Sequence, residues 1–82
     1  MMIPKETLTG LKRYVEDRTP PGGFLTSVLE NNLLESFARA DKENREVLDE
    51  ILCYCYNELP CSCWGSSEKV ENWLLGKEKI QG

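Results

Sequence analysis

The four cysteines of the chain all lie in one stretch, CYCYNELPCSCWGSS, at residues 53–67. Thiolates are common zinc ligands, and structural zinc sites usually take them from Cys-x-x-Cys pairs. This stretch instead has two Cys-x-Cys pairs, and in a helix Cys53 and Cys55 would point about 200° apart. We therefore expect free thiols that are buried or partly buried. Two alternatives stay open: a zinc site built from all four thiols (Cys53, Cys55, Cys61 and Cys63) and a redox-sensitive pair at Cys61 and Cys63.

Candidates for catalysis are scarce. The chain has no His, which is the side chain that most often serves as general acid or base at neutral pH, and a Cys nucleophile would lack its usual imidazole partner. The neighbouring acids Asp49 and Glu50 are expected on a solvated helix face. Gly22 and Gly23 follow two prolines, so they indicate a turn rather than a phosphate-binding loop. We predict no catalytic residues and no cofactor, and hence a protein that is not an enzyme.

The charge of the chain bears on its partners. Ten Lys and Arg stand against 14 Asp and Glu, which gives a net charge of -4. Nucleic-acid binding relies on clustered Lys and Arg, so the composition argues against a nucleic-acid partner. The amino-terminal residues have no cationic segment followed by an apolar run, and no long apolar stretch occurs elsewhere. We expect no membrane contact and a cytoplasmic location.

Apolar residues recur at helical spacing along most of the chain, and no stretch alternates as a half-buried strand would. Breaks are expected at 19–23, where two prolines precede two glycines, at Asn31-Asn32, and at Pro60. Asp41 can cap a new helix, which is expected to be the longest and to end near Leu59. A chain of 82 residues supports one core. The predicted fold is an all-α single domain of four to five short helices over residues 1–76, with a frayed tail at 77–82.

A combination of turn, cap and aromatic residues carries a resemblance to a protein family. It consists of Pro20-Pro21-Gly22-Gly23-Phe24-Leu25, Val28-Leu29, Asn31-Asn32-Leu33, Ala40-Asp41, Asn44, Tyr56-Asn57-Glu58-Leu59-Pro60, Trp64-Gly65-Ser66, Val70 and Trp73. Through these residues the chain resembles, over positions 11–74, a family of short phage and prophage proteins. The resemblance implies a phage accessory protein acting in the cytoplasm of the infected host. The family pattern has no Cys-x-Cys pair in this helix, which argues against zinc.

Most of these shared residues are explained by folding alone, since they form a corner, helix caps and core positions. Asn57, Glu58 and Trp64 are less easily explained in that way. The candidate binding surface therefore joins them to three polar residues that are expected nearby, giving the set Asn31, Asn32, Arg39, Asn57, Glu58 and Trp64.

Three hypotheses for function follow. The first is a non-enzymatic interaction module that binds a host or phage protein, with a homodimer as one possibility. The second is a counter-defence protein that sequesters a small ligand such as a signalling nucleotide, with Arg and Lys on the phosphate and Trp or Tyr on the base. The third is a zinc-stabilised domain. A basic, aromatic-lined groove would favour ligand capture, whereas an apolar patch ringed by acids would favour protein binding.

Overall fold

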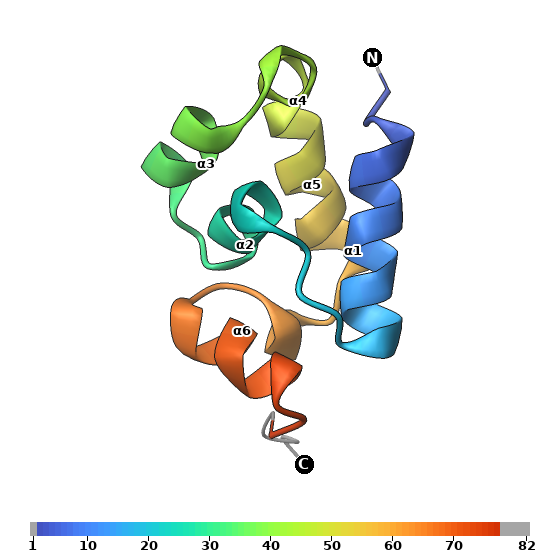
Figure 1. Cartoon of the computed structure of the whole chain (residues 1–82), viewed down its shortest axis with the longest axis vertical. Coiled ribbons are helices and arrows are strands. Elements are labelled where there is room, and N and C mark those ends of the chain that lie inside the picture. Colours follow the sequence, from blue (N-terminus) through green and yellow to red (C-terminus); the bar gives the residue numbers. More distant parts are fainter. Residues whose placement is uncertain (1, 78–82) are drawn as a thin grey trace.

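Short helices, joined by tight corners, make up the chain (Figure 1). The computed structural model describes residues 2–77, and within this range it contains helices and no strands. The helices are α1 (Lys5–Asp17), α2 (Gly23–Leu29), α3 (Leu33–Arg39), α4 (Lys42–Glu46), α5 (Leu48–Glu58), the 3₁₀ helix η1 (Cys61–Cys63) and α6 (Ser67–Leu74). The predicted all-α fold is confirmed. Of the tail expected at 77–82, all but Lys77 lies outside the described residues.

One hydrophobic core joins most of these elements. Its buried members are Leu11, Tyr14, Leu25, Val28, Leu29, Val47, Leu48, Ile51, Cys55, Cys63, Val70 and Trp73. They come from α1, α2, α5, η1 and α6, and from Val47 just before α5. Neither α3 nor α4 contributes a side chain to this cluster. These two helices are therefore held on the domain by other contacts.

The corners form where turn and cap residues predict them. The break at Asn31-Asn32 is confirmed, since Asn31 adopts a left-handed conformation with φ of 63° and the Asn32 side chain accepts a hydrogen bond from the Glu35 amide. In the same way the Asp41 carboxylate accepts from the Asn44 amide, and the Ser66 hydroxyl accepts from the Lys69 amide. Each cap satisfies an amide that the first helical turn leaves without a partner.

The helix that begins after Asp41 differs from the prediction. It is interrupted at Val47, which separates α4 from α5, so the longest helix is α1 and the described residues contain six α-helices. Val47 has φ of -120° and ψ of 22°, and its side chain is only 4% exposed. Its amide bonds the Asn44 carbonyl oxygen at 3.2 Å, a tighter turn than an α-helix makes. The break turns a β-branched side chain into the core, and this burial outweighs local helix propensity.

Hydrogen bonds hold η1 and α6 against α1 and the Arg18 residue that follows it. The Tyr14 hydroxyl donates to the Cys63 carbonyl oxygen at 2.6 Å, and Trp73 Nε1 donates to the Tyr14 carbonyl oxygen at 2.8 Å. Arg18 donates to the Trp73 carbonyl oxygen at 2.7 Å, and its guanidinium lies 4.0 Å from the centre of the Trp73 ring. These contacts join residues 49 to 59 positions apart in the sequence.

Candidate functional site

The residues predicted as a binding surface are spread over several corners of the fold. Asn31 and Asn32 form the α2–α3 corner, where their conformations serve the turn and the cap. Arg39 lies at the other end of α3, and its Nε is 2.7 Å from a Glu35 carboxylate oxygen. Asn57 lies at the end of α5, in a groove shared with α1. The role of this set in binding stays a prediction.

Trp64 follows η1 and lies in the segment that contacts both α5 and the end of α2. The amide of the next residue, Gly65, donates to the Leu29 carbonyl oxygen at 2.7 Å, which places this segment against the end of α2. The Trp64 ring packs edge-on against Tyr56 of α5, with 6.1 Å between the ring centres. Trp64 Nε1 is buried and has no hydrogen-bond partner among residues 2–77. Packing rather than hydrogen bonding therefore holds this ring.

The cysteines fall into two kinds. Cys53 and Cys61 are exposed, whereas Cys55 and Cys63 are buried, and all four are free thiols. Burial raises the pKa of Cys55 to about 12, with a smaller contribution from the neighbouring Cys63, and burial also raises the pKa of Cys63 to about 11. Within residues 2–77 no three or more His, Cys, Asp or Glu side chains are placed to hold a metal ion. The four-thiol zinc site thus has no preformed geometry.

The helix α3 turns its apolar side chains away from the core. Leu33, Leu34 and Phe37 are 60%, 81% and 51% exposed, and the buried residue of this helix is Ser36. An apolar stripe usually marks the side of a helix that packs on the core. Here the stripe faces outward, so folding of the described chain does not account for it.

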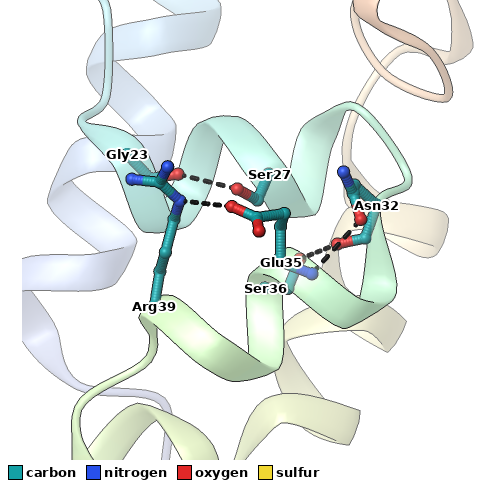
Figure 2. Close-up of polar contacts among 6 residues, drawn as sticks. All are labelled: Gly23, Ser27, Asn32, Glu35, Ser36 and Arg39. Carbon is teal, nitrogen blue, oxygen red and sulfur yellow. Dashed lines mark hydrogen bonds and ion pairs between the residues drawn. The ribbon is translucent and has the colours of Figure 1, made fainter.

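Small and polar groups instead mediate the packing of α3 on α2, as Figure 2 shows. The Ser36 hydroxyl donates to the Asn32 carbonyl oxygen at 2.7 Å, and on α2 the Ser27 hydroxyl donates to the Gly23 carbonyl oxygen at 3.0 Å. A Cβ on Gly23 would lie 3.0 Å from Arg39 Nη1, so the guanidinium end of this side chain reaches from α3 to the start of α2. The two serines bond to carbonyl groups of their own helices, and α3 docks on α2 without burying its leucines.

Two grooves on the described part of the chain have an acidic lining. The first, of about 510 Å³, is lined by Met2, Ile3, Leu8, Asp49, Glu50, Cys53, Tyr54, Asn57 and Glu58. The second, of about 590 Å³, is lined by Thr26, Glu30, Ser67, Glu68, Val70, Glu71, Leu74 and Leu75. Each has three carboxylates and no Lys or Arg among its lining residues. Nucleotide capture requires the opposite charge, because phosphate groups are anionic.

Comparisons with known proteins do not identify the chain: no family model, no curated protein and no solved structure matches it. Among residues 2–77, none of the helices is both long enough and apolar enough to cross a membrane. Sequence reasoning identified α3 as helical but missed the direction of its apolar face. Small residues such as Ser27 and Ser36 lie on the facing sides of α2 and α3, but in the sequence alone they do not differ from surface positions.

Proposed function

We propose that this protein is a non-enzymatic protein-interaction module and that the outward face of α3, formed by Leu33, Leu34 and Phe37, binds a second copy of the chain. The observation that carries the proposal is the exposure of these three side chains. Solvated apolar clusters of this kind mark protein contact sites more often than isolated exposed residues do. The resemblance to short phage proteins supplies the proposed setting, an accessory protein in the cytoplasm of the infected host.

The charges of α3 itself do not oppose a like partner. Glu35 pairs with Arg39 on the side of the helix that faces α2, so these two charges cancel away from the apolar face. The Arg45 guanidinium lies 4.8 Å from the centre of the Phe37 ring, at the edge of the same face. The side chains of α3 therefore add no net charge to a contact between two copies, and Arg45 adds one positive charge per copy at its edge, in a chain whose whole charge is -4.

The energy available predicts weak association. The exposed fractions of Leu33, Leu34 and Phe37 amount to about two whole side chains. Full burial of one such side chain is worth about 1.5–3 kcal/mol, which gives at most about 6–12 kcal/mol for a symmetric pair. Association itself costs about 4–15 kcal/mol. The expected dimer is therefore of micromolar or weaker affinity.

Sedimentation velocity over a range of protein concentrations tests this proposal. The variant Leu33→Glu places a charge in the face, and Leu75→Glu is its matched control, because both leucines are 60% exposed and only Leu33 lies on α3. We expect the wild type and Leu75→Glu to associate as concentration rises and Leu33→Glu to remain monomeric. A wild type that stays monomeric at every concentration contradicts the proposal, as does equal association of the two variants.

A further inference from the structure

The groove between α1 and α5 is a second surface with a defined chemical character. We call it the α1–α5 groove; its lining is the set of nine residues given above for the 510 Å³ groove. One wall comes from the segment before α1 and from Leu8, and the other from a stripe of α5. The two helices are the blue and yellow ones in Figure 1, on the side of the view away from α3.

The lining combines an apolar floor with an acidic edge. Ile3 and Tyr54 are half-buried side chains that pack against the core, and with the half-buried Leu8 they line the groove. Asp49 and Glu58 are exposed at opposite ends of the α5 stripe. An occupant must therefore offer apolar side chains to the floor and positive charge to the two ends.

We propose that the α1–α5 groove binds a basic amphipathic helix from a partner protein. The lining residues of α5 recur from Asp49 to Asn57 at helical spacing, and eight residues of helix span about 12 Å. About two turns of a second helix match this length, in the mode by which an amphipathic helix lays its apolar side in a groove. The inference rests on the proposed function as an interaction module, and it adds the class of partner.

An exposed thiol makes the groove measurable. Cys53 lies in its lining, whereas Cys61, the other exposed thiol, is outside it. An occupant of the groove should shield Cys53 from alkylation and leave Cys61 unaffected. Cys55 and Cys63 are buried and their pKa values are raised, so at neutral pH they react slowly in the folded chain.

The probe is a synthetic helix-forming peptide of Leu and Lys, about four turns long. Alkylation by iodoacetamide is followed site by site with mass spectrometry, using the full chain carrying Leu33→Glu so that association through α3 plays no part. We expect the peptide to slow alkylation of Cys53 and not of Cys61. Equal rates with and without peptide overturn the proposal, and so does equal shielding of both thiols. A failure of the α3 face would leave this readout unchanged.

Charge variants test which groove is used. The double variant Asp49→Asn with Glu58→Gln should weaken peptide binding by about fivefold, as expected for the loss of two exposed ion pairs. Glu68→Gln with Glu71→Gln removes the same charge from the second groove and should leave affinity unchanged. Fluorescence anisotropy of labelled peptide gives both affinities. An equal loss in the control pair would show attraction to net charge alone and would overturn the assignment.

Other occupants are distinguished in the same assay. A peptide with Glu in place of Lys should give no shielding of Cys53, and neither should a peptide of Lys alone with no apolar side chains. Shielding by either peptide would contradict the combination of apolar floor and acidic edge. Shielding of Cys53 that appears without peptide as protein concentration rises would assign the groove to a second copy and would also overturn the proposal.

Discussion

The hydroxyl of Tyr14 provides the sharpest test of how the fold is held together. Tyr14 is fully buried, its ring lies 6.4 Å from that of Trp73, and its hydroxyl donates to the Cys63 carbonyl oxygen at 2.6 Å. Burial is the main reason that the pKa of this hydroxyl is raised, so the group stays protonated and continues to donate. Tyr14→Phe keeps the ring and creates no cavity, but it leaves the Cys63 carbonyl without this buried partner.

The expected loss in the free energy of unfolding is about 1–3 kcal/mol, the cost of leaving a buried polar group unsatisfied. For a chain of this size, each kcal/mol lowers the melting temperature by about 4–8 °C. Urea unfolding followed by circular dichroism gives the free energy, and the slope with denaturant should be unchanged. The control is Tyr56→Phe, because the Tyr56 side chain is 74% exposed, and its effect should stay within about 0.5 kcal/mol. A loss below about 0.5 kcal/mol for Tyr14→Phe would refute the role assigned to this bond.

Two further predictions concern the α1–α2 corner and the buried thiols. Gly22 has φ of 92° and ψ of 170°, a conformation adopted essentially by Gly alone, with open space where a Cβ would stand, so Gly22→Ala should cost about 1–3 kcal/mol from backbone strain alone. Gly23→Ala displaces only the flexible end of Arg39 and should be neutral or stabilise by about 0.5 kcal/mol, and equal thermal destabilisation of the two variants would contradict this difference. The pKa of Cys55 and of Cys63 rises from 9.0 in the unfolded chain to about 12 and about 11 in the folded chain. Because only the unfolded chain releases these protons just above pH 9, stability should fall by up to about 1.4 kcal/mol per pH unit and per thiol as pH rises towards 11, and urea unfolding with a flat profile there would exclude this linkage.

Helix ends could be predicted because their causes are local. Asn32, Asp41 and Ser66 each cap a helix through their own side chains, and the signal lies within four residues of sequence. The break at Val47 could not be predicted in this way. It depends on burial of that side chain among residues from other helices, and local propensity contains no information about such contacts.

The sequence also could not predict that the apolar side of α3 faces away from the core. The spacing of Leu33, Leu34 and Phe37 predicts a helix with one apolar side, but a stripe does not specify whether that side meets its own core or another protein. The small residues that let α3 pack by its other side, such as Ser27 and Ser36, read as ordinary surface positions in the sequence.

The lining of the α1–α5 groove could likewise be predicted only in part from the sequence. Asn57 and Glu58 belonged to the predicted binding set, and both line the groove. Asp49 was expected on a solvated face and is exposed, yet it also contributes to the groove. The opposite wall comes from residues 2–8, about forty positions away, and only the tertiary fold brings these segments together.

Carbon–proton correlation spectra of the leucine methyl groups, recorded at increasing protein concentration, test the central claim about α3 most directly. The signals of Leu33 and Leu34 should shift as their side chains become buried between two copies. Leu75 is as exposed as Leu33 but lies after α6, so its methyl signals should stay in place. Methyl signals of Leu33 and Leu34 that do not change with concentration, or that change no more than those of Leu75, would contradict the account.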